Sequence, residues 1–485
     1  MLRSKAKSAV VRKPKRKSIA REAGLPEGQE NQTGLLMLSD NLDAFAARAL
    51  AARHATHSLD LMYYIWRNDH TGHLLANEIV KAADRGVKVR ILLDDINPHH
   101  NDATYLALDN HPNIALRLFN PSWARNARLL RQLEIVVRFF TMTRRMHNKA
   151  WIADGKIAIV GGRNVGDEYF DAAETNFRDL DLLVLGKAVS QTQEIFDMFW
   201  NSSSVKPIRV LSNAVSTGNA FARRMLAARP ASDVPGPHLG RIEDRKSICD
   251  LVVDGSKLHW TELATVISDP PEKARGEKRQ NWLMKTLLPI IEASRTTLEI
   301  ISPYFIPGEK GVSSLASLVD RNVRVAVLTN SLAATDVAAV HGAYANYRLG
   351  LLRAGVQLFE LQPYARSRNM SVFGSKGASL HTKAFTVDDR YGFIGSLNFD
   401  PRSASLNTEM GVLFEHPELV AELRRCFKID ASSQTSYRVF LDKTRLRWEA
   451  KVDGTKRLFS HEPEASFMRR VVARIVRHLP IESQL

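Results

Sequence analysis

The sequence predicts an α/β protein built from two duplicated halves, each a mostly parallel or mixed β-sheet flanked by helices. Three observations support this fold class. A strand–helix–strand order runs through residues 58–95, the same order returns through residues 297–331, and one motif occurs once in each half. Copies about 235 residues apart indicate a duplicated domain and not a solenoid, whose repeats are much shorter.

The elements of the first half follow from apolar spacing. Residues 41–57 place apolar side chains at helical intervals. Residues 58–66, SLDLMYYIW, form a strand rich in aromatic and apolar residues. A helix follows over 72–86 and ends at Gly86, and VKVRILLDD at 87–95 is the next strand. This βαβ order implies a parallel sheet covered by helices.

The second half repeats this order of elements. Residues 297–307, TLEIISPYFIP, are expected to form a strand, residues 311–322 a helix, and residues 323–331 another strand. The same βαβ reasoning therefore predicts a second sheet of the same kind.

The sharpest repeat is a motif of polar residues and glycine. The first copy, HNKAWIADGKIAIVGGRN, spans 147–164, and the second, HTKAFTVDDRYGFIGSLN, spans 381–398. In both copies Lys follows the His after 2 positions, Asp after 7, Gly after 14 and Asn after 17. The repeat defines the candidate site residues, which are His147, Lys149, Asp154, Asn164, His381, Lys383, Asp388 and Asn398.

The spacing indicates how these residues meet. A histidine and a lysine two positions apart on a strand project from the same face. Asp154-Gly155 is a strong hairpin signal, so the asparagine returns beside the histidine at the end of the next strand. Asp154 and Asp388 are counted with the catalytic motif, although their place at a turn favours holding the strand ends or their own lysine.

Two facing copies suit the chemistry of a phosphodiester. Two ammonium groups offset the charge of the transition state, and asparagine amides donate to the nonbridging oxygens. One imidazole can attack phosphorus while the other protonates the leaving alkoxide and then deprotonates the acceptor. Because the lysines replace metal ions, no metal or other cofactor is expected. The sequence has no HExxH motif, EF-hand loop, paired-cysteine motif or nucleotide-binding P-loop.

The duplicated H-x-K-x4-D motif, with Asn ten positions after the Asp, resembles the phospholipase D superfamily over roughly residues 35–430. Segments 59–69, 143–170 and 395–414 are similar to the bacterial cardiolipin synthase C-type branch. The resemblance implies two phospholipase D-like halves, an active site in the cleft between them, and a phosphohistidine intermediate without metal. It also implies a phosphatidyl lipid as donor and the glycerol head of phosphatidylglycerol as acceptor. That branch lacks the transmembrane pair of other bacterial cardiolipin synthases, and no stretch of 18 apolar residues occurs here.

By the same resemblance, His147 is the nucleophile and His381 is the general acid and base. The residues implied to hold the phosphate are Lys149, Lys383, Asn164 and Asn398, and Ser396 would add a hydroxyl.

A carboxylate downstream of each motif is expected to orient that motif's histidine, because an imidazole nucleophile needs a fixed tautomer. Glu409 fits this role for His381. Asp179 fits it for His147, with Asp181 as an alternative that would otherwise only begin a strand.

Two arginines near the motifs each have two possible roles. Arg163, which stands where the second copy has Leu397, would either bind the phosphate or face solvent. Arg402 suits a second phosphate or a lipid head group, and equally a salt bridge that supports its loop.

The net charge of +16 implies an anionic partner. Residues 1–21 carry nine Lys or Arg and no acidic residue. This tail is expected to be disordered, either as a solvated extension or as a loose anchor to anionic lipid or nucleic acid. The predicted organisation is a basic tail (1–34), a first half (35–204), a linker or flap (205–245), a second half (246–430) and a C-terminal segment (431–485).

Residues 466–480 predict a basic amphipathic helix. Apolar side chains recur every four positions from Phe467, and four arginines flank them. Such a helix suits an anionic membrane interface. It would equally dock on the protein body, and the lipid interpretation of the motif favours the membrane.

Three functions follow. Phosphatidyl transfer that makes cardiolipin is favoured; a hydrolase of phospholipids, or a nuclease of the same superfamily, is the alternative; a catalytically idle membrane-binding protein is the third. The expected partners are phospholipid substrates and an anionic membrane surface, with nucleic acid less favoured and no obligate protein partner indicated. The expected location is cytoplasmic, peripherally associated with the inner membrane.

Overall fold

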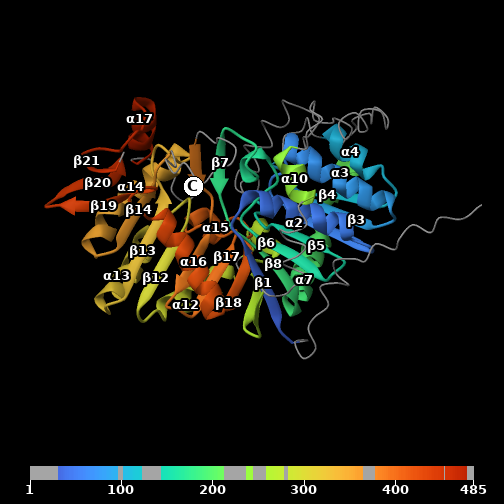
Figure 1. The fold of residues 1–485 in the computed structure, drawn as a ribbon, viewed down its shortest axis with the longest axis horizontal. Coiled ribbons are helices and arrows are strands. Elements are labelled where there is room, and N and C mark those ends of the chain that lie inside the picture. The colour runs from blue at the N-terminus through green and yellow to red at the C-terminus, as the bar shows by residue number, and fades with distance from the viewer. Residues whose placement is uncertain are drawn as a thin grey trace, which may run out of the picture.

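The chain folds into two α/β halves, coloured blue to green and yellow to red in Figure 1. The computed structural model describes residues 31–96, 102–122, 144–211, 236–243, 258–277, 282–363, 377–452 and 454–477. Most of the basic tail and of the predicted linker lies outside the described residues.

The first half is organised around one large mixed sheet. Its strands are β1 (Thr33–Leu38), β2 (Ser58–Tyr63), β3 (Lys88–Asp94), β4 (Ile114–Phe119), β5 (Ala150–Ala153), β6 (Ile157–Gly161), β8 (Asp181–Gly186), β9 (Val205–Pro207) and β10 (His259–Thr261). They lie in the order β10-β1-β8-β6-β5-β2-β3-β4-β9. β2, β3 and β4 are parallel, as the βαβ pattern predicts, and β5, β6 and β8 add antiparallel neighbours.

The second half repeats this sheet. Its strands are β11 (Ala264–Ser268), β12 (Thr297–Ile301), β13 (Arg324–Asn330), β14 (Gln357–Leu361), β16 (Ala384–Val387), β17 (Tyr391–Gly395), β18 (Met410–Glu415), β19 (Ser436–Asp442), β20 (Arg445–Val452) and β21 (Thr455–Phe459). They lie in the order β11-β18-β17-β16-β12-β13-β14-β19-β20-β21. The run from β18 to β14 has the topology of the run from β8 to β4, so the predicted duplication is confirmed.

Helices cover both sheets. In chain order they are α2 (Asn41–His54), α3 (His70–Asp84), α4 (Asp102–Asp109), α7 (Lys187–Trp200), α8 (Ile208–Leu211), α10 (Pro237–Glu243), α12 (Leu283–Glu292), α13 (Gly308–Asp320), α14 (Ala338–Arg353), α15 (Pro401–Ser405), α16 (Pro417–Asp430) and α17 (Phe467–Val476). Two short 3-10 turns are η2 (Asp167–Tyr169) and η3 (Pro271–Arg275). No helix in the described part of the chain is both long and apolar enough to cross a membrane.

One apolar core joins the halves. It contains Phe196 and Phe199 of α7 from the first half, and Leu419 and Phe427 of α16 from the second. Full burial of such a side chain contributes roughly 1.5–3 kcal/mol each. Because the cluster draws on both sheets, the two halves pack as one body, and this packing fixes the seam between them.

The predicted boundaries need two corrections. Residues 205–207 form β9, which pairs with β4, so they belong to the first sheet and not to a linker. The chain passes from the first sheet to the second between β10 and β11, later than the predicted residue 246, because β10 pairs with β1.

The segment after residue 430 is part of the second half, not an appendage. β19 pairs with β14 and extends the sheet through β20 and β21. A buried cluster secures it, since Arg348 of α14 lies 2.8 Å from Glu462 and 3.4 Å from Glu360. Trp448 of β20 donates to the same Glu360 at 2.9 Å. The many charged residues of this segment obscured the alternation of buried and exposed side chains that marks its strands. The buried ones include Tyr437, Val439, Trp448 and Ala450.

Candidate active site

Two short parallel pairings join the halves at the seam. β7 (Thr175–Arg178) pairs with β15 (Gly377–Leu380), with Arg178 opposite Leu380. A second parallel bridge joins Met146 to Thr408. Figure 1 shows β7 at the junction of the two halves. Each pairing ends one residue before a motif histidine, and therefore sets what that histidine faces.

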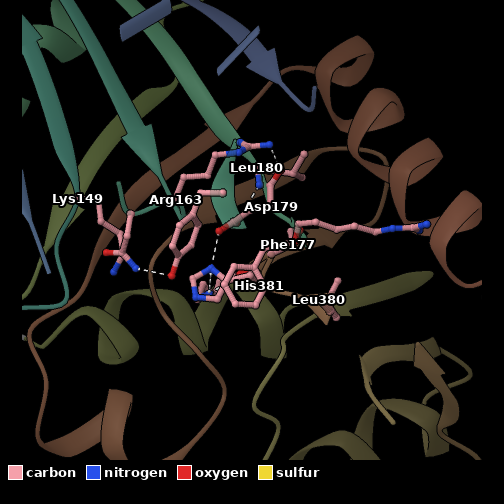
Figure 2. Close-up of polar contacts among 12 residues, drawn as sticks. Lys149, Arg163, Phe177, Asp179, Leu180, Leu380 and His381 are labelled. Atoms are coloured by element: carbon pink, nitrogen blue, oxygen red, sulfur yellow. Dashed lines mark hydrogen bonds and ion pairs between the residues drawn. The ribbon is translucent and has the colours of Figure 1, made fainter. Parts of the chain in front are cut away.

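His381 faces a carboxylate of the first half. It follows Leu380, while Asp179 follows Arg178, so the register of β7 and β15 brings them together. Its Nδ1 lies 2.5 Å from Asp179 Oδ2. Figure 2 shows the two side chains facing each other. Both oxygens of this buried carboxylate are engaged, because Oδ1 accepts from the amide of Leu180 at 2.8 Å.

His147 faces a carboxylate of the second half by the same device. Its amide donates to Thr408 O at 2.9 Å, and its Nδ1 lies 2.8 Å from Glu409 Oε2. Glu409 is fully buried, and its amide donates to Asp269 at 3.0 Å. Lys273 pairs with that aspartate at 2.8 Å, so a buried ion pair fixes the backbone that carries Glu409.

The two carboxylates are therefore exchanged relative to the sequence prediction. Asp179 and Glu409 do contact the motif histidines, but each contacts the histidine of the other half. The predicted pairing within each copy is wrong because contact between the halves, and not distance along the chain, selects the partner. An acceptor at Nδ1 places the proton there and leaves Nε2 as the reactive nitrogen of each ring.

The motif lysines lie against their own histidines. His147 and Lys149 immediately precede β5, and His381 and Lys383 immediately precede β16, so the prediction that they lie on the strands is wrong by a few residues. Lys149 Nζ donates to His147 O at 2.5 Å, and Lys383 Nζ donates to His381 O. Lys383 Nζ also lies 2.8 Å from His381 Nδ1.

Burial dominates the electrostatics of these groups. It lowers the pKa of His147 well below the usual value, and nearby Lys149 and Lys383 lower it further. Burial lowers the pKa of His381 as well, with Lys383 as the next cause. Burial also lowers the pKa of Lys149, and it lowers the pKa of Lys383 to about 8 although Asp179 opposes the shift. Burial therefore disfavours positive charge on all four groups, and a bound anion would favour it.

The motif asparagines differ in their contacts. Asn164 Oδ1 accepts from the amide of Ile65 at 3.2 Å, and its Nδ2 donates to Tyr169 at 2.9 Å. Asn398 is buried, and its Oδ1 has no hydrogen-bond partner among the described residues. Binding of phosphate by either amide stays a prediction. Asn398 has fewer hydrogen bonds within the described protein than Asn164.

Asp154 and Asp388 are turn residues, which corrects their place in the catalytic set. Each lies at the far end of its strand from the histidine, with a φ of 54°. Asp154 accepts from the amides of residues 56–58, and Asp388 from the amides of residues 295–297. They hold the start of β2 and of β12, which is the first of the two roles that their position in the turn favours.

Ser396 and Arg163 also depart from their predicted roles. Ser396 donates to Glu409 Oε2 at 2.5 Å and is fully buried, so its hydroxyl supports the carboxylate instead of adding to a phosphate site. Arg163 is fully buried and neither predicted role fits it. It pairs with Asp181 at 3.2 Å and donates to the carbonyl of Asp179, and Figure 2 shows it next to that residue. Asp181 thus belongs to this support and to the start of β8.

Aromatic rings around the histidines were not predicted. Tyr169 and Phe177 lie 5.2 and 5.0 Å from the His381 ring, and Tyr64 lies 5.0 Å from the His147 ring. The aromatic run at residues 58–66 was the available signal for Tyr64. These rings shield the imidazoles from water and raise the strength of the charges beside them.

No motif residue takes part in a metal-like cluster of the described chain. The two such clusters are His259, His416 and Glu418, and His341, Glu360 and Glu462. The second surrounds Arg348, which disfavours a cation. Arg402 lies within electrostatic range of Tyr64 and of Asp94, whose pKa burial raises to about 6, so its predicted role in binding a head group stays open.

Sequence comparison identifies the family of the chain. The family described as cardiolipin synthase, PLD-like domain, matches residues 51–200 and 287–431. The chain belongs to this family. It is therefore a member of the phospholipase D superfamily of enzymes, as its motif indicates.

Individual relatives are similar in sequence to nearly the whole chain. It is 40% identical to cardiolipin synthase C of Escherichia coli, over 93% of this chain and 96% of the relative. It is 26% identical to cardiolipin synthase 1 of Bacillus anthracis, over 93% of this chain and 74% of the relative. Phosphatidylserine synthase of Haemophilus influenzae has a similar fold, with a TM-score of 0.60 and 14% identity over 96% of this chain and 100% of that structure.

Activity should fall at alkaline pH because Lys383 loses its charge. Its pKa is lowered to about 8, so the ammonium is present below that value and is lost as pH rises through it. We expect kcat/KM to fall about tenfold per pH unit above this point. Lys383→Arg should move the alkaline limb upward, since guanidinium does not titrate there. An unchanged limb in that variant, measured on a short-chain phospholipid, would contradict the assignment.

The crossed pairing predicts which histidine each carboxylate controls. Glu409→Gln should change the imidazole nitrogen shifts of His147 and leave those of His381, and Asp179→Asn should do the reverse. Activity should fall about 10- to 100-fold in each variant. The measurement is ¹⁵N spectroscopy of histidine-labelled protein, assigned with His147→Ala and His381→Ala. Changes within the same half would restore the pairing predicted from sequence.

Proposed function

We propose that the chain transfers a phosphatidyl group to phosphatidylglycerol, and so makes cardiolipin, through a phosphohistidine intermediate. The observation that carries the proposal is the meeting of two His–Lys motifs at one seam, each histidine held by a carboxylate of the opposite half. The similarity to cardiolipin synthases of two other bacteria supports cardiolipin as the product.

In the first step, Nε2 of His147 forms a bond to phosphorus, and the bond from phosphorus to the head-group oxygen breaks. The bound phosphodiester anion favours the protonated form of His381, and this imidazolium gives its Nε2 proton to that oxygen, which leaves as an alcohol. The lysines stabilise the charge on the nonbridging oxygens, an electrostatic contribution that is large where water is excluded.

In the second step, the acceptor hydroxyl gives its proton to His381 and its oxygen bonds to phosphorus. The bond between His147 and phosphorus then breaks, and both imidazoles return to their starting states. Water in place of the acceptor would give hydrolysis, so the same residues support a phospholipid hydrolase as the second candidate.

Cardiolipin formation can be tested by expressing the chain in a bacterial strain that lacks cardiolipin. We expect cardiolipin to appear with the unaltered chain. His147→Ala and His381→Ala should each lower its rate of formation by on the order of 10³-fold, because neither histidine can fill the other's role. The lipid profile is read by mass spectrometry.

A matched control is His57→Ala, since that ring is exposed. It should leave the profile unchanged, and EDTA should leave the purified activity unchanged. Near-normal turnover by either motif variant would contradict the two-histidine mechanism. Cleavage of nucleic acid without any lipid product would favour the nuclease alternative.

We further propose that α17 touches an anionic bilayer at the inner face of the cytoplasmic membrane. One side of this helix docks on the body, with Ala473 packed against Gly342 and Arg469 donating to the carbonyls of Leu332 and Thr335. The other side is apolar and exposed, including Phe467 (77%), Met468 (65%) and Ile475 (56%). The predicted alternatives of docking and membrane contact are therefore compatible.

Vesicle sedimentation tests this contact. Ile475→Glu should weaken the part of binding to phosphatidylglycerol vesicles that persists at high salt, because apolar burial is not screened. Removal of residues 1–21 should weaken the salt-sensitive part, at about 1 kcal/mol per basic residue. Leu263→Glu, at an equally exposed leucine, is the control. Equal binding by Ile475→Glu and the control would contradict the contact.

A further inference from the structure

A fixed carboxylate lies in the loop that follows β13 of the second half. Asp336 is exposed, yet the hydroxyl of Tyr304 lies 2.8 Å from both of its oxygens. The loop that carries it is anchored, since Arg469 donates to Leu332 O at 3.0 Å and to Thr335 O at 2.6 Å. An exposed aspartate usually samples several rotamers, so this one is held in place by its surroundings.

The anchored loop begins next to His381. Asn330, at the end of β13, exchanges two hydrogen bonds of 2.9 Å with the backbone of Leu380, the residue before that histidine. Asp336 follows six positions later in the chain. Its charge acts on Lys383 together with those of Asp179, Glu409 and Asp400. The carboxylate therefore lies on the side of the seam that carries Lys383 and His381.

The second half leaves a buried acceptor atom without a hydrogen-bond partner at this place among the described residues. The bridges Trp66–Val165 and Phe305–Phe399 occupy equivalent positions, so Tyr304 takes the place that Ile65 has in the first half. In the first half, the amide of Ile65 donates a hydrogen bond to Oδ1 of Asn164. In the second half, the buried Oδ1 of Asn398 has no hydrogen-bond partner among the described residues.

We infer that Asp336, aligned by Tyr304, forms a subsite for the hydroxyl groups of a polyol acceptor such as glycerol, next to the buried and unpaired oxygen of Asn398. Carboxylate and amide oxygens accept O–H hydrogen bonds, and a bond to a charged carboxylate is the stronger of the two. The inference rests on the proposed transfer, in which His381 takes the proton of the reacting hydroxyl. A neighbouring hydroxyl would then donate to Asp336, and the Asn398 amide would keep its N–H groups for phosphate.

The test is a competition between two alcohols in one mixture. The phosphatidyl donor is phosphatidyl-p-nitrophenol in detergent micelles. Its leaving group, p-nitrophenol, has no second hydroxyl. Glycerol and 1-propanol are supplied at equal concentration, and the ratio of phosphatidylglycerol to phosphatidylpropanol is measured by mass spectrometry. This ratio reports acceptor choice and is independent of the overall rate of each variant.

The wild type should favour glycerol. Asp336→Asn should lower the glycerol-to-propanol ratio about tenfold, which is the size expected for loss of a hydrogen bond to a charged group. Tyr304→Phe should lower it by about threefold, since the carboxylate stays but is no longer aligned. Asp320→Asn, at an exposed aspartate of α13, should keep the wild-type ratio.

Each outcome decides a separate point. A wild-type ratio in both Asp336→Asn and Tyr304→Phe overturns the subsite while leaving phosphatidyl transfer intact. Formation of neither alcohol product by the wild type refutes the transfer itself, and the subsite with it. If Asp336→Asn does not fold, the ratio in Tyr304→Phe decides the case alone.

Discussion

The site depends on two backbone pairings between the halves. Leu380 lies opposite Arg178, and Met146 lies opposite Thr408. Because strands run in register, the next residue of each segment also meets its counterpart, and those residues are a histidine and a carboxylate. The chemistry is thus positioned by main-chain hydrogen bonds, which are less variable than the rotamers of long side chains. The shared core of α7 and α16 keeps the pairings together.

Much of this arrangement could be predicted from the sequence, since local signals set it. Apolar periodicity located the βαβ elements, and the repeat located both histidines and lysines. The histidine partner of each carboxylate could not be predicted, because Asp179 and Glu409 each follow their own motif closely in sequence, and only the contact between the halves selects the other histidine. The buried position of Arg163 could not be predicted for a related reason. Its guanidinium pairs with Asp181 in the interior, and no local pattern distinguishes such a pair from a surface charge.

The C-terminal strands show another limit of sequence patterns. Residues 436–459 carry enough charge to look irregular, yet they complete a sheet. Their buried side chains alternate with charged ones on the solvent face, which is what an edge of an antiparallel sheet requires. Arg348 and its carboxylates add a buried network that no local sequence pattern indicates, since its members come from α14, β14 and the segment before α17.

The crossed contacts also have a meaning for divergence. A symmetric homodimer of one half would be obliged to place the same acid beside both imidazoles. In the fused chain, His381 faces an aspartate and His147 faces a glutamate, and the latter alone has a serine hydroxyl on its carboxylate. Because the two halves are joined in one chain, the two imidazoles can have different surroundings. Selection can adjust the basicity of one imidazole without altering the other, which is the condition for a division of labour between a nucleophile and a proton carrier.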